Sequence, residues 1–221
     1  MARKTYQKEL ETLRVEVLAM GEMAVSNYDD ALRTLDTKDD DLAADIAAAD
    51  EAINDRYLAL ESDCIDLFAL QQPVAGDLRF VASSFKILTD LERVGDLATN
   101  VADYALDAAR ERYPEVDIRH IGERAREMLT EALSAYADGD AEAAREVAAR
   151  DDEVDRLCET ATETVFESLL RTEYGDATEA ILADARRLLL TVRDLERIAA
   201  HAVNICARVV YMVEHDDELI Y

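Results

Sequence analysis

Three side chains with oxygen ligands recur four residues apart in one segment of the sequence, namely Glu92, Asp96 and Asn100. On an α-helix, residues four apart lie on the same face, so these side chains form a row. Carboxylate and amide oxygens are ligands for Mg²⁺, Ca²⁺, Mn²⁺ or iron, whereas a structural zinc site uses Cys or His. The first chemistry that this sequence offers is therefore the binding of a metal cation.

The segment that carries this row returns later in the chain as Asp194–Asn204, where six of its eleven positions are identical. Glu196 and Asn204 repeat the outer members of the row, but Ala200 stands at the central, acidic position. An alanine, Ala199, also replaces the glycine that precedes that position. We therefore expect the second row to bind a cation incompletely or not at all.

One helix rarely supplies all the ligands of a cation, so further oxygens must come from another element. The preceding helix of each half offers a pair of polar residues spaced by four, Asp50 and Asn54 in the first half and Asp151 and Asp155 in the second. In a chain that is 33% charged, a solvated acidic face is an equally good interpretation of each pair.

The residues offer little for catalysis. None of His120, His201 and His215 follows a Glu by three positions, so the Glu-x-x-His motif of di-iron helical enzymes is absent from the sequence. There is no Gly-rich phosphate loop, paired Cys motif or evident Ser-His-Asp set. We expect a protein that is not an enzyme, with His201 as the histidine closest to a candidate site.

The elements that position these residues are predicted to be helices. Gly and Pro are scarce, with 6 and 2 of 221 residues, and half of the residues are hydrophobic, which argues against disorder. Apolar residues recur at spacings of three and four in six stretches, the first from Leu10 to Leu35 and the fifth from Val147 to Leu169. The breaks between the stretches fall at 36–41, 71–73, 114, 138–140 and 174–176.

This pattern repeats along the chain. Equivalent positions lie 101 residues apart early in the halves and 104 apart at the polar rows, which an insertion near 171–176 explains. Pro114 is the best boundary, so we predict an all-α fold of two tandem, internally repeated three-helix bundles, residues 1–113 and 114–221. Asp176 and Glu179 have the spacing of a capping box at the start of the last helix.

The net charge of −26 is extreme for this length. A role in cation buffering, avoidance of nucleic acid and adaptation to a high-salt cytoplasm could each produce it, and the even spread of the charge favours the last, because salt screens self-repulsion. The absence of a basic patch argues against direct binding of nucleic acid. The N-terminus lacks the apolar core of a signal peptide, and no apolar run is long enough to insert into a membrane.

Three cysteines, Cys64, Cys158 and Cys206, are far apart and lie within apolar helical patterns. We expect them to be small buried residues of a protein in a reducing compartment, without a disulfide framework.

Taken together, the two polar segments resemble the Leu-Glu-Arg-(Ile/Val)-Gly-Asp-x-Ala-x-Asn helix of the PhoU family of phosphate-signalling regulators. Residues 72–79 are similar to that family's Gln-Pro-Val-Ala-x-Asp-Leu-Arg motif, and Met20-Gly21 in the first helix also matches. The resemblance extends over essentially the whole chain, with order and spacing preserved.

Membership implies a cytoplasmic, usually dimeric protein without enzymatic activity. Such a protein restrains phosphate uptake and signalling by contacting the ATPase subunit of the phosphate ABC transporter and, in bacteria, a sensor histidine kinase. Some members carry multinuclear iron or zinc clusters on Glu-x-x-x-Asp motifs. Carried over residue by residue, the metal positions are Glu92, Asp96, Asn100, Glu196 and Asn204.

Two alternatives to this adaptor role stay open. The chain could be a carboxylate-ligated metal-binding bundle with a redox or storage role, although the missing Glu-x-x-His and the incomplete second row weigh against it. It could also be a purely structural helical interaction module.

Overall fold

The fold is described from a computed structural model, which describes residues 2–70, 75–107, 113, 115–172, 175 and 178–220. Every regular element among these residues is an α-helix, which confirms the all-α prediction. The helices are α1 (Ala2–Thr37), α2 (Asp40–Leu70), α3 (Ala75–Asp107), α4 (Ile118–Asp138), α5 (Ala141–Ala148), α6 (Asp151–Arg171) and α7 (Thr178–Glu214).

The repeat is visible where the first helix of each half ends and the next begins. Lys38 and Gly139, 101 residues apart, both adopt a positive φ, of 50° and 65°. The residue that follows each caps the next helix: Asp39 accepts hydrogen bonds from the backbone of Asp41 and Leu42, and Asp140 does the same for α5. The predicted equivalence of these two turns is confirmed.

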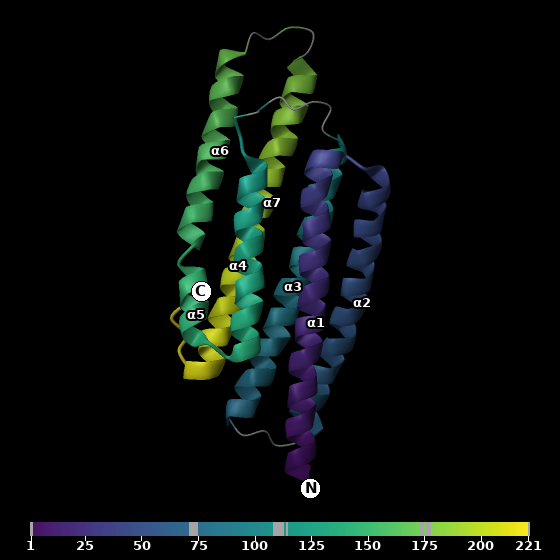
Figure 1. Cartoon of the computed structure of the whole chain (residues 1–221), viewed down its shortest axis with the longest axis vertical. Helices are drawn as coiled ribbons and strands as arrows, with labels where there is room; N and C mark the ends of the chain where they lie inside the picture. The colour runs from purple at the N-terminus through teal and green to yellow at the C-terminus, as the bar shows by residue number, and fades with distance from the viewer. Residues whose placement is uncertain are drawn as a thin grey trace.

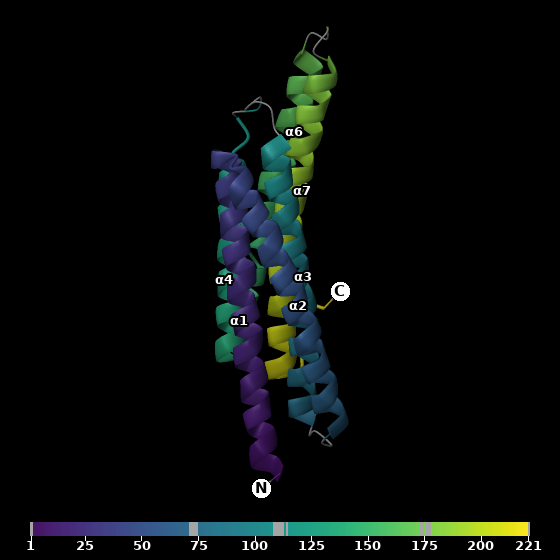
Figure 2. The ribbon, with the colours of Figure 1, turned by 90° about the vertical axis from the view of Figure 1, so that its right-hand side faces the viewer.

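The helices form one elongated bundle in which four of them make a central ring (Figures 1 and 2). Helix α1 packs on α3, α3 on α7, α7 on α4, and α4 back on α1. Helix α2 covers the first half of this ring from outside, and α5 and α6 cover the second half. The two predicted bundles are therefore present, with α5 and α6 together in the place of the second bundle's middle helix, and a single buried cluster runs through both of them.

Two glycines set how closely the halves approach. A Cβ built on Gly21 of α1 would lie 2.8 Å from the side chain of Leu133 on α4, and one built on Gly122 of α4 would overlap Leu32 on α1. Each glycine thus receives a leucine of the other half, and the two contacts are equivalent in the repeat. Tyr28 strengthens the crossing by donating a hydrogen bond of 3.0 Å to the carbonyl of Gly122.

The middle helix of the second half differs from the prediction. The stretch from Val147 to Leu169 was predicted as one helix, but the chain turns at Ala149 and Arg150, which separates α5 from α6. The turn places Asp152 and Glu153 in the first turn of α6, where negative charge is stabilised by the helix N-terminus. Arg150 also forms an ion pair with Glu131 of α4, which anchors the turn to the ring.

Some predictions fall on residues outside the described ranges. Pro73, Pro114 and Asp176 are among them, so the breaks at the two prolines and the capping box at Asp176 stay predictions, as does the division into residues 1–113 and 114–221. Cys64, Cys158 and Cys206 are all buried and free, as expected. Within the described part of the chain, no helix has both the length and the apolar content needed to cross a membrane.

Candidate functional site

The first polar row lies on α3 and faces α2 through a gap that a glycine leaves open. Asp50 of α2 points at Gly95, since a Cβ built on that glycine would lie 2.7 Å from the Asp50 Oδ1 atom. Oδ1 is buried and accepts no hydrogen bond from the described residues, whereas Oδ2 accepts one from Asn54 at 3.4 Å. A buried carboxylate oxygen without a donor is unfavourable, and a cation would satisfy it.

The carboxylates around this gap share one electrostatic environment. Burial raises the pKa of Asp50, and the negative charge of Asp96 raises it further. Burial also raises the pKa of Glu92, with Asp96 as the second cause and Asp50 as a smaller one. The structure thus brings together Asp50, Glu92 and Asp96, which we call the first acidic cluster.

A basic residue already neutralises part of the first acidic cluster. Arg93 donates to Asp96 at 2.8 Å and lies 3.4 Å from Glu92, with about half of its side chain exposed to solvent. Among the described residues, no three His, Cys, Asp or Glu side chains converge closely enough to form a ready metal cage. Asn100 lies one turn beyond Asp96 and is half-buried. The carboxylate oxygens of the cluster are therefore suitable ligands for a hard cation. On the solvent side, Arg93 is already paired with Glu92 and Asp96.

The second half contains a corresponding group, the second acidic cluster, made of Asp151, Asp155 and Glu196. Burial, followed by the charges of Asp155, Asp152 and Glu196, raises the pKa of Asp151 to about 6. Burial and Asp155 raise the pKa of Glu196. The acid that α7 lacks at Ala200 is thus matched by an acid on α6.

Aligning the two halves shows where each carboxylate of the two clusters stands. Asp155 stands where the first half has Asn54, and Ala200 stands where it has Asp96, so both clusters keep three carboxylates. However, Ala199 fills the place of Gly95 with a fully buried methyl group. Among the described residues, the second cluster also has no buried oxygen left without a donor. The first cluster is therefore the better candidate for a cation.

Asn204 has a different environment from its predicted one. Its side chain donates a hydrogen bond of 3.0 Å to Asp90 of α3, and His201 Nδ1 lies 2.9 Å from the same carboxylate oxygen. These contacts join α3 to α7 across the two halves. Asp90 was not among the predicted site residues, although it is the first residue of the repeated segment, Asp90–Asn100, and its repetition as Asp194 marks it.

The equivalent of Asp90 in the second half is Asp194, which is fully buried. Its Oδ1 accepts from Arg193 at 2.7 Å, and Arg197 lies 3.9 Å away. Since Ala200 offers Arg197 no carboxylate, the cationic side chain turns toward Asp194 instead, whereas Arg93 pairs with Asp96. The two repeated segments therefore also differ in the partners of their arginine and first aspartate.

Comparison with known proteins gives a consistent result. The family model described as "PhoU domain" matches this chain twice, over residues 17–105 and 118–209. The chain is 36% identical over 215 residues to the phosphate-specific transport system accessory protein PhoU homolog of Pseudomonas aeruginosa, covering 96% of this chain and 86% of that protein.

Solved structures agree with this match. The crystal structure of PhoU from Pseudomonas aeruginosa superposes with a TM-score of 0.89 at 33% identity, covering 96% of this chain and 100% of that one. The phosphate transport system regulatory protein PhoU from Streptococcus pneumoniae superposes with a TM-score of 0.87 at 29% identity, covering 98% of this chain and 99% of that one.

The raised pKa of Asp151 predicts a pH-dependent cost in stability. The folded state holds this proton more tightly than the unfolded state, so the contribution of Asp151 to stability is lost as pH rises through about 6. In metal-free protein, Asp151→Asn should raise the Tm at pH 7 by about 2–4 °C and leave it unchanged below about pH 4.

Thermal unfolding followed by circular dichroism from pH 4 to 8 measures this effect. The control is Glu159→Gln, which removes an exposed carboxylate from the same helix. Equal gains in Tm from both substitutions would show that net charge, rather than the burial of Asp151, is responsible.

Proposed function

Because this chain belongs to the PhoU family, we propose that it is a cytoplasmic adaptor that restrains phosphate uptake by binding the ATPase subunit of a phosphate ABC transporter. Its relatives carry the name of accessory proteins of a phosphate-specific transport system, which supports this assignment. A sensor histidine kinase is a second partner of the same kind in our proposal. The adaptor works through protein contact and needs no catalytic step.

Binding to a partner protein is supported by a set of exposed apolar side chains that recurs in both halves. Ile65 on α2 and its equivalent Phe166 on α6 are each 54% exposed, and Leu78 on α3 and its equivalent Leu182 on α7 are 44% and 50% exposed. Single exposed apolar residues are ordinary on protein surfaces. Their recurrence at equivalent positions supports two similar contact surfaces, one beside the end of α2 and the start of α3 and one beside the end of α6 and the start of α7.

We also propose that the first acidic cluster holds a divalent or iron-type cation. Asp50, Glu92 and Asp96 supply carboxylate oxygens, and the unpartnered oxygen of Asp50 supports the fit. A bound cation supplies positive charge that offsets the repulsion of these groups and joins α2 to α3. Because α2 and α3 also carry Ile65 and Leu78, the cation stiffens the hairpin that presents the first contact surface.

The contact proposal predicts that Ile65→Asp/Leu78→Asp will reduce recovery of the transporter ATPase with this protein by about tenfold. The two added charges would oppose burial of the hairpin surface, and a loss of about 1.4 kcal/mol already gives this factor. The measurement is co-purification of tagged chain and ATPase subunit from cells grown in high and in low phosphate.

Val15→Asp is the control, because Val15 is also exposed, at 59%, but belongs to α1 and not to α2 or α3. Wild-type recovery should change with phosphate supply. Recovery that stays at the wild-type level in the hairpin variant, or that never depends on phosphate, would contradict the adaptor proposal.

The cation proposal predicts that Asp50→Asn and Asp96→Ala each lower the metal content of purified protein by more than half, because a three-carboxylate site loses one charged ligand. Glu196→Gln should have a smaller effect. Metal analysis by mass spectrometry and the rise in Tm on adding Mn²⁺ are the two measurements. Metal-free wild-type protein that gains no stability from Mn²⁺, or equal losses from both clusters, would refute the site.

A further inference from the structure

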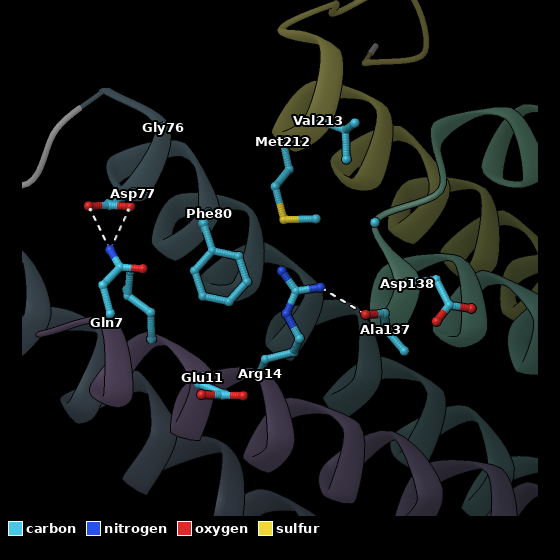
Figure 3. A pocket seen from close by; sticks show the side chains of 12 residues that line it. Gln7, Glu11, Arg14, Gly76, Asp77, Phe80, Ala137, Asp138, Met212 and Val213 are labelled. Carbon is cyan, nitrogen blue, oxygen red and sulfur yellow. Dashed lines mark hydrogen bonds between the residues drawn. The ribbon is translucent and has the colours of Figure 1, made fainter. Parts of the chain in front are cut away.

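A second site lies at one end of the central ring, where helices of different length stop at different levels. Helices α1 and α3 continue toward their N-termini past the point where α4 ends at Asp138 and α7 ends at Glu214. The missing turns leave a cavity of about 610 Å³ between the four helices (Figure 3). This volume is within the range of ligand-binding pockets. We call it the bundle-end pocket.

The floor of the bundle-end pocket is apolar. Leu10 of α1 and Phe80 of α3 are almost completely buried and form its deeper part. Met212 and Val213 of α7 close it from the other side, and Val213 remains 40% exposed. Figure 3 shows the Met212 side chain reaching toward Phe80 and Arg14 across the cavity. An apolar side chain from a partner would gain burial here.

Arg14 is the one basic residue among the described residues that line the pocket, and the protein itself uses its charge. Its Nη1 atom donates to the carbonyl oxygens of Tyr136 and Ala137, at 3.0 and 2.9 Å. These carbonyls belong to the last turn of α4, where the helix dipole is negative. The guanidinium also lies over the rings of Phe80 and Tyr136, at 5.0 and 5.6 Å. Arg14 is therefore a structural cap for α4 rather than a free anion receptor.

The rim of the pocket is acidic. Glu11, Asp77 and Asp138 line it; Glu11 and Asp138 are exposed, and Asp77 is half-buried. No described Lys, Arg or His forms an ion pair with any of them. Asp77 accepts only long contacts of 3.4 Å from the amide of Gln7. Three uncompensated carboxylates therefore surround an apolar floor, and they attract cations and repel phosphate.

We propose that the bundle-end pocket binds a basic, amphipathic segment of a partner protein. An aliphatic side chain of that segment packs on Met212 and Val213, and flanking Lys or Arg side chains pair with the rim carboxylates. Charge complementarity of this kind raises the association rate and selects the partner, while the buried apolar anchor supplies most of the affinity. The inference rests on the adaptor function above and specifies the chemistry of one contact.

The test uses the full-length chain labelled with ¹³C at the methionine methyl groups. Met212 reports the pocket, and the buried Met20 and Met128 serve as internal references. The probe is an octapeptide of alternating Arg and Leu with blocked ends, compared with a Glu–Leu peptide and with inorganic phosphate. We expect a saturable shift of the Met212 signal with the Arg–Leu peptide alone.

Variants separate specific binding from attraction to an acidic protein. Glu11→Gln/Asp77→Asn should weaken peptide binding at least about fivefold, and Val213→Arg should abolish the shift. Glu159→Gln/Glu163→Gln removes the same charge from exposed positions on α6 and should leave binding unchanged.

Three results would overturn the proposal: a Met212 signal that does not move, a similar shift with phosphate or the Glu–Leu peptide, and equal weakening by the α6 control. Peptide binding that persists while co-purification with the ATPase fails would reject the adaptor function and retain the pocket. Loss of peptide binding with intact co-purification would reject the pocket alone.

Discussion

The close crossing of α1 and α4 is the constraint on which the rest of this structure depends. The side chain of Leu133 packs against Gly21, and that of Leu32 packs against Gly122. Each half therefore contributes one leucine and one glycine to the crossing. Overpacking such a contact costs about 1–3 kcal/mol. The same crossing allows Tyr28 to reach the Gly122 carbonyl. It also closes the ring that brings α3 against α7.

Contacts between α3 and α7 then decide what the polar rows can do. Asp90 binds His201 and Asn204 from the other half, so the distal amide of the second row serves the interface. In the first half, Gly95 leaves room for Asp50, and a buried oxygen remains without a donor. Duplication thus produced two similar acidic clusters, but their surroundings have made the first better suited to a cation. The same architecture repeats exposed apolar residues and leaves a pocket where helices of unequal length end.

Much of the fold could be predicted from the sequence because its signals are local. The spacing of apolar residues indicates the helices, and the repeat offset pairs Asp39 with Asp140 as caps. The split between α5 and α6 could not be predicted, because no Gly or Pro marks Ala149 and Arg150, and the turn depends on a contact of Arg150 with α4.

The candidate site was predictable in part for the same reason. Glu92 and Asp96 lie on one face of one helix, so their proximity follows from spacing alone. The partner of Asn204 depends on how α7 packs against α3, which helical periodicity does not specify. The repeat offset shows that the second half lacks an acid at Ala200 and has an extra one at Asp155. Only the fold shows that α6 brings Asp155 near Glu196. The bundle-end pocket depends on differences in helix length and has no sequence motif.

The crossing of α1 and α4 should join the two halves into one cooperative unit. Hydrogen exchange of wild-type protein and Gly122→Ala, followed by mass spectrometry, tests it most directly, with Gly76→Ala as control because a Cβ there meets nothing within 4 Å. We predict that Gly122→Ala speeds exchange in α1–α3 and in α4–α7 alike, and that the control does not. Faster exchange confined to α4–α7 would show that the halves are independent and would contradict this account.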